Sequence, residues 1–188
     1  MITAIVGTVE DEQGLLRGNG KTNVMTYYGR REYLADKAVY SNYKTLFSKQ
    51  ITMQKMMDMI IHDDLRNVVL LIDEIQIMLN SLGAKHTVVK FVDKAIAQTR
   101  KKGVDILYTS QRFWNVHARL RQQTDVVIKP KKYHYDFSEC MLDRCNKRHI
   151  IAIYMVQPVR YNPIQWIRPE IVGKWYDSNE VIDEDIKL

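Results

Sequence analysis

Five consecutive residues, Val68–Ile72, are large and apolar, with no polar residue between them. A strand with one face in water alternates apolar and polar side chains, so an unbroken apolar run of this length is typical of a central parallel strand covered on both faces. A second such strand is predicted over Val104–Tyr108, after a predicted helix over Thr87–Lys102, which ends at Gly103. The pattern therefore favours an α/β fold.

The rest of the chain continues this alternation of strands and helices. Strands are predicted over residues 2–6, 37–43 and 126–128, and helices over residues 23–34 and 53–61, the second capped by Thr52. We expect a doubly wound, mostly parallel sheet with helices on both faces. Residues 1–130 would form this core, and residues 131–188 a C-terminal extension, with strands over 150–156 and 161–166, packing on the core or on a neighbouring subunit.

A glycine-rich segment, Gly18-Asn19-Gly20-Lys21-Thr22, precedes the helix predicted from Asn23. In a loop between a strand and a helix, the glycines let backbone N–H groups turn toward a phosphate, and the helix N-terminus adds partial positive charge. Lys21 would reach the β and γ phosphates of ATP, and Thr22 would offer its hydroxyl to Mg²⁺. The nucleotide-binding residues predicted here are Gly18, Asn19, Gly20, Lys21, Thr22 and Asn23.

The spacing of this segment departs from the phosphate-loop pattern G-x-x-x-x-G-K-[ST]. Leu15 stands where the first glycine belongs, and the nearest glycine is Gly14. We interpret residues 8–17 as an insertion between the first strand and the phosphate cradle, with Gly7 in place of the missing glycine.

Two adjacent carboxylates, Asp73 and Glu74, follow the apolar run Val68–Ile72. At the end of such a strand Asp73 would hold Mg²⁺ through a water, and Glu74 would orient or deprotonate an attacking water. A kinase that transfers phosphate to a small acceptor needs no second acid to activate water. The pair therefore favours an ATPase.

The third motif is Ile106-Leu107-Tyr108-Thr109-Ser110-Gln111-Arg112, a strand with a polar end. Gln111 would lie beside the strand that carries Asp73 and sense the γ-phosphate. The combination of VVLLIDE with KKGVDILYTSQRF resembles the HerA/FtsK superfamily of DNA-pumping ATPases, and QTRKKGVDILYTSQRF with RLRQQTDVVI resembles the genome-packaging ATPases of archaeal viruses. The resemblance covers residues 1 to 130.

This resemblance implies an ASCE-type, RecA-like P-loop core that works as a homo-oligomeric ring, a pentamer or hexamer, with each site completed by an arginine from the neighbouring subunit. Such an arginine stabilises charge on the transferring phosphoryl group. Arg100 is the first candidate, with Arg112, Arg119 and Arg121 as alternatives. The implied partners are double-stranded DNA and a capsid or portal component, and the implied location is the cytoplasm of an infected host cell.

The net charge of +6 is concentrated in the middle of the chain, where residues 94–150 hold 13 Lys/Arg against 5 Asp/Glu. Such a segment is either a solvated basic face or a contact for the DNA backbone. Phe113 and Trp114 lie within it and belong either to the core or interface or to a DNA channel. The candidate DNA-contacting residues are Arg112, Arg119, Arg121, Lys129, Lys131 and Lys132.

Two cysteines and two histidines lie close together in the predicted extension: His134, Cys140, Cys145 and His149. Their spacing is permissible for zinc but not diagnostic of it. We favour a helix over residues 137–147 that buries Phe137, Cys140, Met141 and Cys145. Two cysteines are too few for a secreted disulfide framework, which indicates a reducing compartment, and no segment is apolar enough to span a membrane.

The sequence thus predicts an ATP-hydrolysing DNA translocase, in particular a viral genome-packaging motor. Two alternatives stay open. One is a P-loop phosphotransferase acting on a nucleoside or nucleotide. The other is a non-catalytic, nucleotide-binding factor similar to the Zot-like phage morphogenesis proteins.

Overall fold

The computed structural model describes residues 1–8, 19–62, 65–81, 85–142, 145–160 and 162–176 of the 188-residue chain. The strands are β1 (Ile2–Thr8), β2 (Ala38–Ser41), β3 (Lys49–Gln50), β4 (Val68–Ile72), β5 (Asp105–Arg112), β6 (Val126–His134), β7 (His149–Gln157) and β8 (Gln165–Ile167). The helices are α1 (Lys21–Leu34), α2 (Met53–His62), α3 (Ile75–Ser81), α4 (Lys85–Lys102), a short 3₁₀ turn (Phe113–Asn115), α5 (Ala118–Gln122) and α6 (Pro169–Val172). None of these helices is both long enough and apolar enough to cross a membrane.

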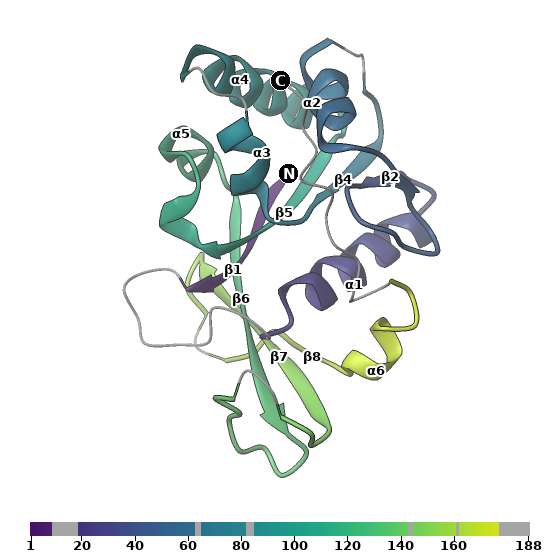
Figure 1. The fold of residues 1–188 in the computed structure, drawn as a ribbon, viewed down its shortest axis with the longest axis vertical. Coiled ribbons are helices and arrows are strands. Elements are labelled where there is room, and N and C mark those ends of the chain that lie inside the picture. Colours follow the sequence, from purple (N-terminus) through teal and green to yellow (C-terminus); the bar gives the residue numbers. More distant parts are fainter. Residues whose placement is uncertain (9–18, 63–64, 82–84, 143–144, 161, 177–188) are drawn as a thin grey trace.

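All eight described strands join one sheet, in the order β3-β2-β4-β5-β1-β6-β7-β8. The strands from β3 to β6 are parallel to their neighbours, and β7 and β8 are added antiparallel at the far edge. Figure 1 shows α2, α3, α4 and α5 on one side of the sheet and α1 and α6 on the other. The doubly wound, mostly parallel α/β fold predicted from the sequence is confirmed.

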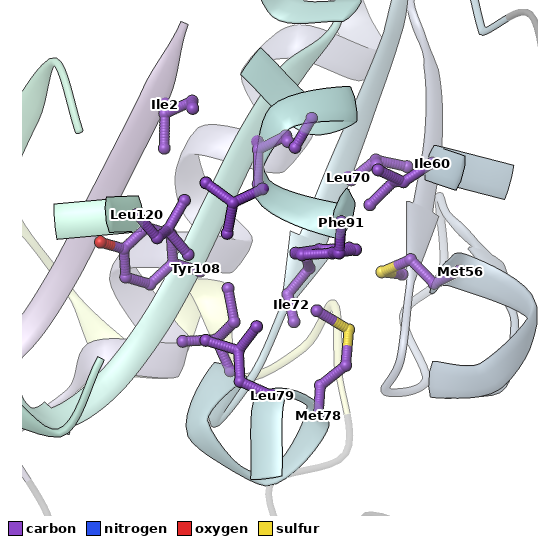
Figure 2. Packing of buried hydrophobic residues seen from close by; sticks show 14 of the residues in the cluster. Ile2, Met56, Ile60, Leu70, Ile72, Met78, Leu79, Phe91, Tyr108 and Leu120 are labelled. Atoms are coloured by element: carbon purple, nitrogen blue, oxygen red, sulfur yellow. The ribbon is translucent and has the colours of Figure 1, made fainter. Parts of the chain in front are cut away.

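The strand β4 shows why its sequence lacks alternation. Val68, Leu70 and Ile72 pack into the core under α2, α3 and α4, whereas Val69 and Leu71 pack into the core under α1. In the first of these cores Phe91 of α4 lies among residues of β4, α2 and α3 (Figure 2). Both faces of β4 are therefore buried.

Two helices show how local sequence sets the packing. The helix α2 begins as predicted after Thr52, whose Oγ1 accepts a hydrogen bond from Lys55 N at 3.2 Å. Its methionines Met53, Met56 and Met57 are buried in the core. In α1, a Cβ added at Gly29 would lie 2.5 Å from Leu71 Cδ1, so the glycine that weakens the helix also allows it to approach the sheet closely.

The C-terminal part departs from the sequence prediction in two places. The strand β6 does not stop at Pro130 but continues to His134, because beyond Ile128 it pairs with β7 and no longer with β1. The division at residue 130 therefore falls inside a strand. The helix predicted over 137–147 is wrong: none of its described residues is helical, and Phe137 and Met141 are 65% and 55% exposed.

Candidate active site

The phosphate-loop residues meet the two carboxylates at the carboxyl ends of β1, β4 and β5. A cavity of about 460 Å³ opens there, and Asn19, Gly20, Lys21, Thr22 and Asn23 line it together with Glu74 and Gln111. In parallel α/β sheets the carboxyl ends of the strands are the usual place for a ligand. The strand β5 lies between β1 and β4, so the segment before α1 and the carboxylates after β4 approach the cavity from strands that are not adjacent.

Gly20 starts α1 in a conformation that favours glycine, with φ at 90° and ψ at 23°. Its carbonyl accepts the hydrogen bond from Val24 N at 3.0 Å, but it offers no side chain to cap the first turn. The N–H groups of this turn lie at the positive end of the helix dipole, where an anionic ligand is favoured. Lys21 is buried at the same end of the helix.

Thr22, Asp73 and Thr109 form one hydrogen-bond network at the edge of the cavity. Thr22 Oγ1 donates to the two carboxylate oxygens of Asp73 at 3.2 and 3.4 Å, and Thr109 Oγ1 donates to Asp73 Oδ1. Thr109 in turn accepts from Glu74 N at 2.9 Å. The network joins the first turn of α1 to the ends of β4 and β5.

Burial raises the pKa of the Asp73 carboxyl above its ordinary value, and the charge of Glu74 raises it further. The hydrogen bonds from Thr109 and Thr22 and the charge of Lys21 act in the opposite direction. Burial and the charge of Asp73 also raise the pKa of Tyr176, which lines the cavity, to about 12. The negative charge at Asp73 is therefore incompletely compensated by its neighbours.

Glu74 has a left-handed backbone, with φ at 53°, which is uncommon for a residue other than glycine. Two hydrogen bonds hold this conformation. Glu74 N donates to Thr109 Oγ1, and Glu74 O accepts from Ile77 N at 2.9 Å in the first turn of α3. Gln76 Nε2 also donates to Glu74 Oε2. The turn places Glu74 at the cavity beside Gln111, which comes from the end of β5.

Asn42, which follows β2, holds the backbone of Asp73 from the other side. Its Nδ2 donates to Asp73 O at 2.9 Å, and its Oδ1 accepts from Asp73 N at 2.7 Å. The sequence analysis gave no role to Asn42 or to Thr109. The signal available for both was a polar residue at the carboxyl end of a strand that neighbours β4.

Six residues beyond position 130 also line the cavity, and the motifs did not place them there: Lys132, Cys145, His149, Ile151, Pro169 and Tyr176. Lys132 comes from β6, and His149 and Ile151 come from β7. A Cβ added at Gly20 would lie 2.3 Å from Ile151 Cδ1, which shows how closely β7 approaches the start of α1.

Other predicted residues lie elsewhere. Gly18 and most of the interpreted insertion fall in residues 9–18, outside the described residues; Gly7 lies within β1 and not in the loop after it. Arg100 lies in the last turn of α4. This helix ends near the amino ends of β4 and β5, where Asn67 N donates a hydrogen bond to Lys102 O at 3.0 Å. The side chain of Arg100 is outside the described part, and its backbone is at the opposite edge of the sheet from the cavity.

The basic residues proposed for DNA contact lie on three elements, β5, α5 and β6. Arg119 pairs with Asp93 at 2.7 Å, and the Arg121 guanidinium lies 4.0 Å from the centre of the Trp114 ring. Phe113 is buried in the core, whereas Trp114 is 60% exposed. Lys131 pairs with Glu139 at 3.2 Å and Lys132 Nζ donates to Leu142 O at 2.6 Å, whereas Arg112 is exposed at the end of β5.

The sheet order, the glycine turn before α1 and the cavity at the strand ends define this chain as a P-loop protein of the RecA-like class. Residues 25–136 match the family model described as Zonular occludens toxin (Zot). The match spans more than half of the chain, which therefore belongs to the Zot family. No curated protein matches the chain.

Three solved structures are similar to this chain. The genome packaging NTPase B204 from Sulfolobus turreted icosahedral virus 2, in complex with AMP, has a TM-score of 0.50 and 15% identity over 87% of this chain and 98% of that chain. The flagellar accessory protein FlaH from Methanocaldococcus jannaschii has a TM-score of 0.48 and 11% identity over 86% and 82%. The RuvB Holliday junction branch migration motor of Thermotoga maritima has a TM-score of 0.44 and 16% identity over 72% of this chain and 39% of that chain. This chain spans about 39% of that motor's length. At 15% identity, the likeness to B204 shows the fold alone.

Proposed function

We propose that the cavity binds ATP with its phosphates at the start of α1. Gly20 brings the backbone close to the ligand, Lys21 provides a positive charge, and the uncapped first turn of α1 provides N–H donors. Asn23 Oδ1 is buried beside the cavity and has no hydrogen-bond partner among the described residues. A buried polar atom of this kind fits a site that is completed by a ligand.

Thr22 and Asp73 are the residues proposed to hold Mg²⁺. Both offer oxygen, which this cation prefers, and they are hydrogen-bonded to each other at the edge of the cavity. A cation there would offset the charge that burial and Glu74 leave uncompensated at Asp73. When bound, Mg²⁺ would neutralise charge on the phosphates and polarise them.

Glu74 is the proposed general base of ATP hydrolysis. Its backbone is fixed by Thr109 and by the first turn of α3, so its carboxylate can orient a water and accept its proton without first being ordered. Lys21 would stabilise the charge of the transferring phosphoryl group, and Gln111 would sense it from the end of β5. The observation that carries this proposal is the network linking Thr22, Asp73 and Thr109, with Glu74 held beside it.

We further propose that hydrolysis drives movement of double-stranded DNA, in a homo-oligomeric ring of the HerA/FtsK type that packages a viral genome in the cytoplasm of an infected cell. Arg100 is the proposed arginine finger. Its backbone lies at the end of the sheet opposite the cavity of its own chain, so in this role it would have to act on the site of a neighbouring subunit. Arg112 and the exposed Trp114 are the proposed contacts to the DNA backbone. A capsid or portal component is the proposed protein partner.

The family membership favours a second candidate, a nucleotide-binding assembly factor of the Zot type that binds ATP without turnover. It predicts ATP binding with Mg²⁺, no steady release of phosphate and no effect of DNA. The motor predicts phosphate release that rises when double-stranded DNA is added.

The test is phosphate release by the full chain with and without linear double-stranded DNA, together with equilibrium binding of ATP. Glu74→Gln should keep the binding of ATP and lose about 10²–10⁴-fold in turnover, the range expected for removal of a general base. Glu32→Gln, at the far end of α1, is the matched control and should behave as wild type. Normal turnover in Glu74→Gln would remove Glu74 as the base, and ATP binding without turnover in wild type, with or without DNA, would favour the second candidate.

A further inference from the structure

The tip of the β6–β7 hairpin gathers four side chains that the proposed ATPase does not use. His134 and His149 are the last cross-strand pair of this antiparallel ladder, and their ring centroids are 5.0 Å apart. The connection between the strands folds back along β6, where Cys140 N donates to Lys132 O at 2.8 Å. This return brings Cys140 and Cys145 to the two histidines. The strands β6 and β7 lie in the lower part of Figure 1.

The potential ligand atoms of these four residues lie within 4.8 Å of one another. Zinc bound tetrahedrally, with Zn–S near 2.3 Å and Zn–N near 2.0–2.1 Å, requires its ligands to lie about 3.3–3.8 Å apart. Cys145 Sγ and His134 Nε2 are separated by 3.5 Å and already meet this requirement. The remaining atoms need to move by about 1 Å at most.

The surroundings of the two imidazoles favour ligation. His149 Nε2 is buried and has no hydrogen-bond partner among the described residues. His134 Nδ1 lies 3.0 Å from Ser138 Oγ, which itself donates to Asp136 Oδ1 at 2.6 Å. An Nδ1–H that donates to Ser138 leaves the lone pair on His134 Nε2, the atom that faces Cys145. Outer partners of this kind orient the histidine ligands of metal sites.

We propose that His134, Cys140, Cys145 and His149 form a structural zinc site. Two thiolates and two imidazoles in a tetrahedral arrangement are a donor set typical of zinc, and four protein ligands leave no position for a substrate. Both cysteines are free thiols. The ligands pair across a hairpin and not along a helix, which is why their spacing in the sequence gave only a weak signal.

The site would also fix one wall of the nucleotide cavity. Cys145 and His149 line that cavity, and so does Lys132, whose Nζ is held by Leu142 O in the same connection. Zinc would hold the hairpin tip in the arrangement that places these groups opposite the start of α1. Its role is therefore to position this wall and not to take part in the chemistry.

The first test is the metal content of the full chain, purified without chelators and measured by inductively coupled plasma mass spectrometry. We expect about one zinc per chain, as a single four-ligand site requires. Cys145→Ser and His149→Gln should lose the metal, whereas Met141→Ala in the same connection and His62→Gln in α2 should keep it. Ser138→Ala removes only the outer partner of His134 and should weaken zinc affinity about 10- to 100-fold.

A cobalt titration of the metal-depleted wild-type chain keeps the test independent of whether the variants fold. Two thiolates on tetrahedral Co²⁺ should give sulfur-to-metal charge transfer in the near ultraviolet and intense visible bands, which zinc then abolishes. Absence of both zinc and this cobalt spectrum would overturn the proposal.

Thiol titration of the denatured chain, without reductant, separates zinc from a disulfide between the same cysteines. Two reactive thiols per chain are expected after denaturation, and protection of both before it. A zinc-free protein with no reactive thiol would overturn the proposal in favour of a disulfide. A disulfide would not give the buried His149 Nε2 a partner.

Discussion

Replacing Asn42 by alanine tests whether this residue holds the end of β4 in place. Asn42 is buried and makes two hydrogen bonds to the backbone of Asp73, of 2.9 and 2.7 Å. The substitution leaves one N–H and one C=O of Asp73 without their partners. Each unsatisfied buried group costs about 1–3 kcal/mol.

Because Thr22 and Glu74, the neighbours of Asp73, line a cavity that water can enter, we expect the lower part of this range for each group, about 2–3 kcal/mol in total. For a domain of this size each kcal/mol lowers the melting temperature by about 2–4 °C, so Asn42→Ala should melt about 4–12 °C below wild type. Differential scanning calorimetry measures this shift. The exposed Asn80 provides the control, since Asn80→Ala should melt within about 2 °C of wild type.

The same variant should bind ATP more weakly when Mg²⁺ is present, because the carboxylate proposed to hold the cation belongs to the residue that has lost its support. Asn42→Leu keeps most of the side-chain volume but neither hydrogen bond, and should behave like Asn42→Ala. If Asn42→Leu has the melting temperature of wild type, lost packing and not lost hydrogen bonding explains the lower melting temperature of Asn42→Ala. This result would refute the argument that Asn42 stabilises the protein through the backbone of Asp73.

Three further substitutions test the start of α1, the proposed ring and the base of the sheet. Gly20→Ala should weaken ATP binding in an isothermal titration, because alanine costs about 1–2 kcal/mol in a left-handed conformation and its Cβ would meet Ile151. Adding Ile151→Ala should relieve only the contact between these side chains. Full recovery of ATP binding in the double variant would contradict the argument from the backbone conformation. Arg100→Ala should abolish phosphate release while leaving ATP binding intact, and loss of binding would exclude an arginine finger. The Lys37 Nζ, 2.6 Å from Asp105 Oδ2, holds the pKa of that carboxyl below its ordinary value against the opposing effect of burial, so Asp105→Asn should cost about 1.5–3 kcal/mol at pH 7. The stabilisation is present above the unfolded-state pKa of Asp105 and is lost as pH falls through its lower folded-state pKa. In urea unfolding, the stability difference between wild type and Asp105→Asn should therefore shrink below about pH 4. A stability difference that stays constant from pH 7 to 3 would show that charge is not its cause.

The central strands could be predicted because their sequence reports burial directly. Val68–Ile72 is apolar at every position, and only a strand with helices on both faces buries all five side chains. The helix before β5 was equally clear from its spaced apolar residues and the glycine after it. In these segments local pattern and tertiary environment agree.

The hairpin tip could not be predicted because its apolar residues do not share a face. Phe137 and Met141 are spaced as in a helix, but Phe137 adopts a left-handed backbone with φ at 62° and both side chains are largely exposed. Ser138 N donates to Asp136 Oδ1 at 3.0 Å, a turn that competes with helix and that the sequence Asp-Phe-Ser is able to signal.

The candidate site divides in the same way. Lys21, Thr22, Asp73 and Glu74 were predicted from local motifs; Lys21, Thr22 and Glu74 line one cavity, and Asp73 accepts a hydrogen bond from Thr22 beside it. Asn42 carries no motif, because its importance comes from Asp73, which is 31 positions away in the chain. Residues that position a site through long-range contacts become visible only when the sheet order is known.

The sheet order also changes the status of the residues beyond 130. The strand β6 pairs with β1 through Val126–Ile128 and then continues as the partner of β7, so the connection from the core to the hairpin is one unbroken strand. Ile151 of β7 lies against Gly20, and Lys132 and His149 face the same cavity. A glycine turn built from the core alone would lack this wall and leave the edge of β6 exposed. The part of the chain that looked like an extension in the sequence is therefore structurally continuous with the site, and the proposed zinc would act on ATP binding through it.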